Sequence, residues 1–169
     1  MAGRATRIAA RIVFFVSGAV SIAVGVVFWS MHGTELPYQA DWPIFAGVPF
    51  LTGVVAVLSA LLPRRWTGKV FGVAPDDPSL LTVPGEGWLI VAATAYLIAL
   101  VFHLTRESWH PGQQWTFSLC IVCGITASMG PQDHSLVSIL LMLAPINAAI
   151  YGSIGLTLGY AWFFLRRRP

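Results

Sequence analysis

The lysine and arginine residues of this chain are confined almost entirely to short stretches that border its apolar segments. Nine of the ten fall within residues 4–11, 64–69 and 166–168, and only Arg106 lies elsewhere. Basic residues beside membrane spans are retained on the cytoplasmic side. The spacing therefore predicts a membrane protein whose N-terminus, central loop and C-terminus are all cytoplasmic.

Composition agrees with a membrane location, since 56% of the 169 residues are hydrophobic and 10% are charged. This length suffices for about four spans of roughly 20 residues with short connections and no separate extramembrane domain. The formal net charge of +3 comes from the predicted cytoplasmic clusters, which would face anionic lipid. We therefore expect the lipid bilayer as a partner, and no nucleic acid.

We predict an all-α integral membrane protein, a single transmembrane helical bundle over residues 1–169. Its four spans are expected at about 9–29, 43–62, 87–104 and 136–165, with an irregular inner loop at 63–86 that is rich in glycine and proline. We expect the first span to be retained, because it lacks the small residues of a signal-peptide cleavage site. Tryptophans should mark the two interfaces: Trp29, Trp42, Trp109 and Trp115 outside, and Trp66, Trp88 and Trp162 inside.

The segment at 115–130 is apolar for only about 15 residues, roughly 22 Å of helix, which is short of the hydrocarbon thickness. A complete crossing there would also move the final arginine cluster outside. We therefore predict a short re-entrant or interfacial helix for 115–130. The last apolar segment is longer than one span needs, so it should tilt, kink at Pro145 or project beyond the bilayer.

The predicted topology places all four histidines near the outer face. A metal site there would draw on imidazole and carboxylate ligands, namely His32, His110, His134 and Asp133. The alternative is a set of scattered interfacial polar groups. His103, inside the end of the third span, is a candidate axial ligand for a haem or chlorin, or a donor to a quinone carbonyl. Its simpler role is to reach the headgroups or to pair with Glu107 at i+4.

Cys120 and Cys123 form a CxxC in an apolar run. This run resembles the CxxC of the vitamin K epoxide reductase family, a resemblance that covers about four residues and implies electron exchange between thiols and a quinone. That family uses a second cysteine pair in an outer loop, whereas this chain has two cysteines in total. The alternative is a pair of small buried apolar residues.

Small residues recur at helical spacing in the first and last spans, which predicts close helix packing. Asn147 can cap carbonyl groups freed by Pro145 or bond to another helix. The alternative is a broken helix that lines a transport site. The predicted packing positions are Gly18, Gly25, Asn147, Gly152, Gly155 and Gly159.

The function favoured by these patterns is that of a non-catalytic accessory or structural subunit of a membrane complex, with other membrane helices as partners in a homo-oligomer or larger complex. We expect no enzyme activity, and the residues identify no cofactor. Two alternatives remain: a quinone-linked thiol oxidoreductase or cofactor-binding subunit that uses Cys120, Cys123 and His103, and a small transporter. The expected location is the cell membrane, as a multi-pass protein of a bacterial inner membrane.

Overall fold

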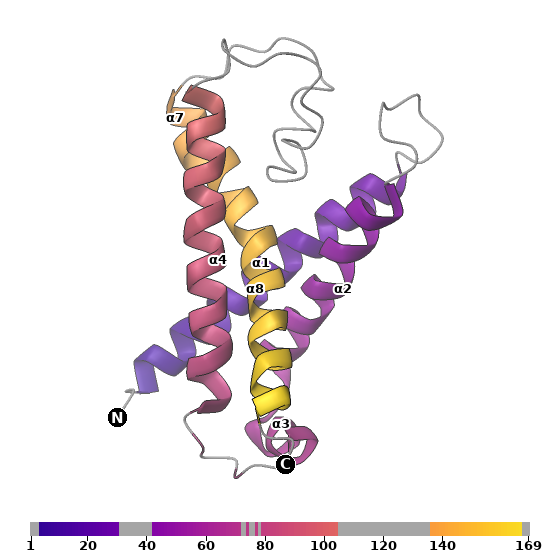
Figure 1. The fold of residues 1–169 in the computed structure, drawn as a ribbon, viewed down its shortest axis with the longest axis vertical. Helices are drawn as coiled ribbons and strands as arrows, with labels where there is room; N and C mark the ends of the chain where they lie inside the picture. The colour runs from indigo at the N-terminus through magenta and orange to yellow at the C-terminus, as the bar shows by residue number, and fades with distance from the viewer. Residues whose placement is uncertain are drawn as a thin grey trace.

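The computed structural model describes residues 4–30, 42–71, 74, 77, 79–104 and 136–166, and all regular structure in these ranges is helical. Figure 1 shows the arrangement of the helices. In chain order they are α1 (Arg4–Ser30), α2 (Trp42–Leu61), α3 (Arg64–Phe71), α4 (Ser79–Leu104), α7 (Leu136–Ser138), the π-helical turn η2 (Ile139–Leu143) and α8 (Ala144–Arg166).

Three of the described helical segments are long and apolar enough to cross a membrane. They are Ala5–Ser30, Thr82–Val101 and Ile139–Arg166, and α2 contributes a shorter apolar helix, Ala46–Leu61. Large apolar side chains such as Leu51, Ile90 and Leu141 lie exposed on the outside of the bundle. This surface is consistent with a membrane protein.

The helices form two antiparallel pairs, α1 with α2 and α4 with α8, and α8 also packs against α1 and α2. The beginning of α1, helix α3 and the end of α8 lie toward the same end of the bundle in Figure 1. The beginning of α2 and the end of α4 lie toward the opposite end. Helix α8 therefore provides most of the contact between the two pairs.

Helices α1 and α2 touch backbone to backbone because two glycines face each other. A Cβ atom on Gly18 would lie 2.6 Å from the carbonyl oxygen of Gly53, and one on Gly53 would lie 2.7 Å from that of Gly18. Two turns along α1, a Cβ on Gly25 would lie 2.8 Å from the carbonyl oxygen of Ala46. These contacts leave no space for a side chain on either glycine of the crossing.

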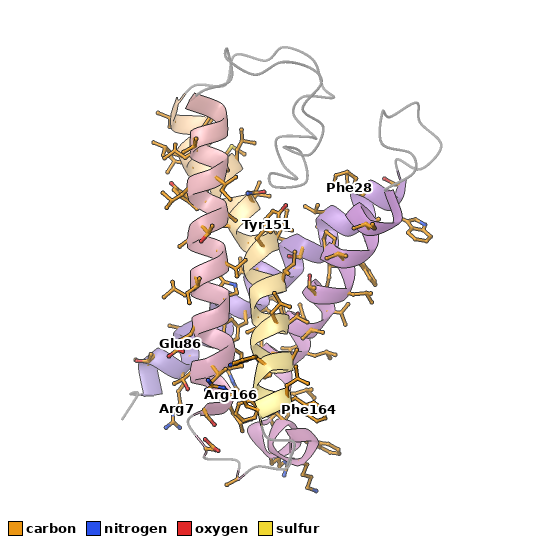
Figure 2. All side chains as sticks on the ribbon, viewed as in Figure 1. Arg7, Phe28, Glu86, Tyr151, Phe164 and Arg166 are labelled. Atoms are coloured by element: carbon orange, nitrogen blue, oxygen red, sulfur yellow. The ribbon has the colours of Figure 1, made fainter. Side chains whose placement is uncertain are left out.

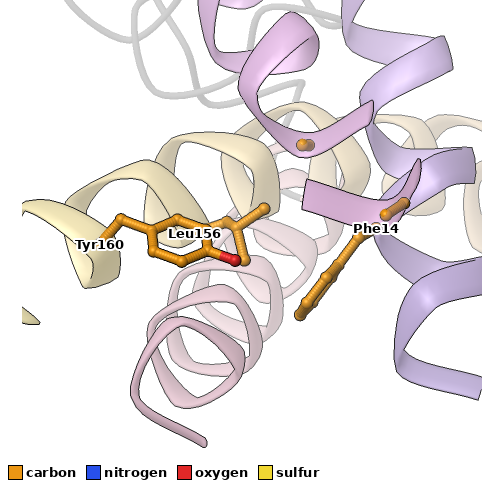
Figure 3. Close-up of a cluster of buried hydrophobic side chains, with 5 residues drawn as sticks. Phe14, Leu156 and Tyr160 are labelled. Carbon is orange, nitrogen blue, oxygen red and sulfur yellow. The ribbon is translucent and has the colours of Figure 1, made fainter. Parts of the chain in front are cut away.

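A small apolar core lies where α1, α2 and α8 meet, as Figure 3 shows. Two aromatic rings and one leucine fill the space that the short alanine side chains of α2 leave open. Its members are Phe14, Ala56, Ala60, Leu156 and Tyr160, each at most 9% exposed. The core continues the glycine contact toward the end of the bundle where α2 ends.

The predicted irregular loop at 63–86 is wrong in two places, because it contains α3 and the first eight residues of α4. Asp77 explains the early start of α4: its carboxylate accepts a hydrogen bond from the backbone N–H of Ser79 at 2.9 Å and another from the Ser79 hydroxyl. A side-chain oxygen at this position satisfies N–H groups that the first turn of a helix leaves free.

Pro84, which was predicted to lie in the loop, and Gly87, which was predicted to begin the third span, both lie inside α4 and face α8. A Cβ on Gly159 would lie 2.7 Å from the Cα of Pro84, and a Cβ on Gly87 would lie 2.5 Å from the carbonyl oxygen of Gly155. Residue types that break helices in water serve here to bring two helices together, as is common in membrane helices. The partial helix predicted at 115–130 lies outside the described residues.

The glycine crossing of α1 and α2 can be tested with a matched pair of alanine substitutions in α2. Gly53→Ala should lower the free energy of unfolding by about 1–3 kcal/mol, because the methyl group meets the backbone of α1. Gly47→Ala should leave stability unchanged or raise it, since a Cβ there meets no atom within 4 Å and alanine favours the helix. Unfolding of both variants in detergent measures the difference, and equal effects would contradict the crossing.

Candidate functional site

A chain of hydrogen bonds joins α1, α4 and α8 in the interior of the bundle. The indole Nε1 of Trp88 donates to the Ser17 hydroxyl at 3.0 Å, which donates to the carbonyl of Ala149 at 3.2 Å. From the other side, the Ser21 hydroxyl donates to the Ser153 hydroxyl at 3.1 Å, and this donates to the same Ala149 carbonyl at 3.1 Å. We call these five residues the serine seam.

The serine seam follows from helical spacing. Ser17 and Ser21 are four residues apart and therefore share one face of α1, and Ala149 and Ser153 share one face of α8 in the same way. The three serines are at most 2% exposed. Every serine hydroxyl proton in the seam is donated to α8, so the seam fixes α8 against α1 without a charged group.

The glycines of α1 face a different neighbour. Gly18 lies about 100° around the helix from Ser17, and this rotation directs it toward α2. The small residues of α1 therefore form two adjacent faces, a glycine face against α2 and a serine face against α8. One helix serves both contacts because each face needs only small side chains.

Helix α4 packs closely against three glycines of α8. A Cβ on Gly152 would lie 2.5 Å from the indole Nε1 of Trp88, so the ring lies directly over this glycine. Gly155 faces Gly87 and Val91, and Gly159 faces Pro84. The absence of a side chain at 152 thus positions the Trp88 indole to reach Ser17 on the third helix.

The π-helical turn η2 precedes Pro145, where a kink was one of the three alternatives predicted from the sequence. The N–H of Ala144 bonds to the carbonyl of Ile139, five residues back. The next bond in this pattern would need an N–H on Pro145, which proline lacks. The carbonyl of Leu140 instead accepts a hydrogen bond from the Tyr96 hydroxyl at 3.3 Å, so α4 satisfies the carbonyl that the proline leaves free.

Asn147 joins the same two helices one turn further along α8. Its side-chain Nδ2 donates to the carbonyl of Ala95 at 2.9 Å, and the residue is fully buried. Its Oδ1 accepts no hydrogen bond from the described part of the chain. Asn147 therefore bonds to another helix, which was one of the two roles considered for it from the sequence.

The candidate metal and redox residues cannot be placed in the same way. His103 belongs to the last turn of α4, and the described residues do not extend to its side chain. Within those residues, no group of three histidine, cysteine or acidic side chains is arranged to hold a metal ion. The other candidates lie outside the described residues: His32, His110, Cys120, Cys123, Asp133 and His134.

Part of this site was not predicted from the sequence. Trp88 was expected to mark the inner membrane interface, but its indole N–H points into the bundle and bonds to Ser17. Ser153 and Tyr96 were given no role. The available signal was the i, i+4 pair of serines in an apolar helix, because a hydroxyl in a membrane needs a partner.

Comparison of the chain with known protein families, with curated proteins and with solved structures finds no match. The chemistry of the site must therefore be judged from its own residues. All side chains in the seam are neutral, and none of the described groups beside its serines is a histidine, carboxylate or lysine that would activate a hydroxyl for nucleophilic attack. The arrangement is suited to holding helices together.

The link between Ser17 and Trp88 can be measured with a double-mutant cycle. Ser17→Ala and Trp88→Phe should each lower stability, and the pair should show a coupling energy of about 0.6–1.7 kcal/mol, the range found for hydrogen bonds between membrane helices. Ser59→Ala is the matched control, because the Ser59 hydroxyl donates at 2.7 Å to Val55 within its own helix. Additive effects of the two substitutions would show that the bond contributes nothing.

Proposed function

We propose that this chain is a four-span protein of the cell membrane with both termini in the cytoplasm, and that it serves as a non-catalytic accessory or structural subunit of a membrane complex. The observation that carries the proposal is the serine seam, in which neutral side chains of α1 and α4 donate hydrogen bonds to neighbouring helices. Such an interior is suited to maintaining a shape in the bilayer. Among the described residues, this interior offers no charged group at mid-membrane for ion or proton transfer.

The distribution of charge supports the topology. Figure 2 shows Arg7, Glu86 and Arg166 toward the same end of the bundle, with Phe28 toward the other. The guanidinium group of Arg11 donates to the carbonyl of Leu62 at 3.4 Å, just beyond the end of α2. Because basic residues are retained in the cytoplasm, this end is assigned to the inside. At 20 residues, α2 reaches about 30 Å, the thickness of the hydrocarbon core.

The outer surface supports association with other helices. In the apolar windows of α1 and α4, only 28% and 22% of the residues are buried inside the bundle, compared with 44% for the segment that contains α8. Helices α1 and α4 thus present broad apolar faces to the membrane. In the proposed role, lipid covers part of these faces and partner helices cover the rest.

Reporter fusions test the topology. Green fluorescent protein fused after residue 71 or after residue 169 should fluoresce, because both points are expected in the cytoplasm. Alkaline phosphatase fused after residue 104 should be active, because this enzyme matures only outside the inner membrane. An active phosphatase fusion after residue 169 would move the C-terminus outside and support five crossings.

The proposed role is tested by the size and spectrum of the native particle. Full-length protein extracted from its own membrane in a mild detergent should migrate in a discrete particle well above the 18.3 kDa of one chain, after correction for detergent, and should be colourless. A lone chain would contradict the subunit role. A bound chromophore, or quinone reduction by the purified chain, would favour the oxidoreductase reading of Cys120, Cys123 and His103, and solute uptake into vesicles would favour the transporter.

A further inference from the structure

Helix α3 has one fully exposed face that combines positive charge with an aromatic ring. Arg65, Trp66 and Lys69 lie within about 100° of one another around the helix axis and are all exposed. Gly68 lies about 60° from Arg65 around the helix axis, on the side away from Trp66, and is buried. The Nζ atom of Lys69 lies over the Trp66 ring, 5.7 Å from its centroid.

The start of α3 keeps this face close to the apolar end of α2. The backbone N–H of Leu62 bonds to Leu58 at 2.8 Å, and the Pro63 carbonyl then accepts bonds from the N–H groups of Trp66 at 2.9 Å and Thr67 at 3.4 Å. The chain therefore turns directly from α2 into α3. Leu61 is 63% exposed and Trp66 is 55% exposed, so apolar and aromatic surface continue from one helix to the next.

The end of α8 carries a second pair of the same kind. The guanidinium group of Arg166 lies 4.9 Å from the centroid of the Trp162 ring, and Trp162 and Leu165 are both more than half exposed. Figure 1 places α3 and the C-terminal end of α8 at the same end of the bundle. Two separate elements thus present a cation above an exposed indole beside apolar surface.

Charge at this end is strongly one-sided. The described ranges contain seven basic residues but only two acidic ones, Asp77 and Glu86. The Asp77 carboxylate accepts hydrogen bonds from Ser79, so it is occupied in capping α4. Within the described residues, the cations of α3 therefore outnumber the carboxylates at this end, which favours an anion from outside the chain.

We propose that the Arg65–Trp66–Lys69 face of α3 and the Trp162–Arg166 pair of α8 bind the headgroups of anionic phospholipids. The indole rings lie at the boundary of headgroups and acyl chains, where an aromatic ring with a polar edge is favoured. The Lys69 and Arg166 cations bind the phosphates at the same depth. Lipid is the occupant because the cations adjoin exposed leucine side chains, which a soluble anion would leave in water. This site is independent of the proposed subunit role.

The test uses the full-length protein in detergent with dioleoyl phosphatidylglycerol added in steps, and an apparent Kd is obtained from the rise in Tm. Lys69→Gln should raise this Kd about fivefold, the effect of one cation near an anionic surface. Lys69→Arg should keep the Kd of the parent. Arg166→Gln tests the second pair in the same way.

Three controls separate a site from general charge attraction. Glu86→Gln changes the net charge at the same end by one unit, so an equal and opposite change in Kd would reduce the effect to net charge and overturn the proposal. Dioleoyl phosphatidylcholine should raise Tm much less than phosphatidylglycerol, and an equal rise would also overturn it. Glycerol phosphate should have no effect, because it lacks the acyl chains that contact Trp66 and Leu61, and a matching rise in Tm would exclude lipid as the specific occupant.

Discussion

The fold depends on backbone contact between helices, which glycine permits at the crossing positions and a side chain there would prevent. In a bilayer, apolar side chains gain little by leaving lipid for protein, so helix pairs need close packing and hydrogen bonds. The contacts of Gly18 with Gly53 and of Gly155 with Gly87 provide that packing in the two antiparallel pairs. Once the backbones lie this close, short hydroxyl side chains reach across from one helix to the next.

Helix α8 links the two pairs because its faces carry different small residues. Its glycines pack against α4. Its Ala149 carbonyl and Ser153 hydroxyl accept hydrogen bonds from the serines of α1. The Trp88 indole spans all three helices by lying over Gly152 and bonding to Ser17. A change at Gly152 would therefore disturb the α1 contact as well as the α4 contact, although the atoms nearest to a Cβ at 152 belong to Trp88.

The sequence was a good guide to helix locations and a poor guide to helix partners. The apolar runs predict α1, α2 and α8 closely because continuous hydrophobicity marks a span by itself. The start of α4 was predicted too late because Pro84 and Gly85 count as loop residues in water, whereas here Pro84 lies inside the helix and packs against Gly159 of α8. Which helices pack together depends on how each helix is rotated about its own axis. The apolar pattern of a single sequence does not reveal this rotation, because a membrane span is apolar on all sides. The division of α1 into a glycine face and a serine face is therefore visible only in the structure.

The most direct test of this account is a disulfide between α1 and α8 in the membrane. The hydroxyl oxygens of Ser21 and Ser153 are 3.1 Å apart, close enough for cysteines at both positions to pair with small adjustments. In a chain with Cys120 and Cys123 replaced by alanine, the Ser21→Cys, Ser153→Cys variant should form an intramolecular disulfide upon mild oxidation. A Thr94→Cys, Ser153→Cys variant should not, because Thr94 is exposed on α4 and its hydroxyl bonds to Ile90 within that helix, whereas Ser153 is fully buried. Failure of the first pair to cross-link, or cross-links only between chains, would contradict the packing of α8 against α1.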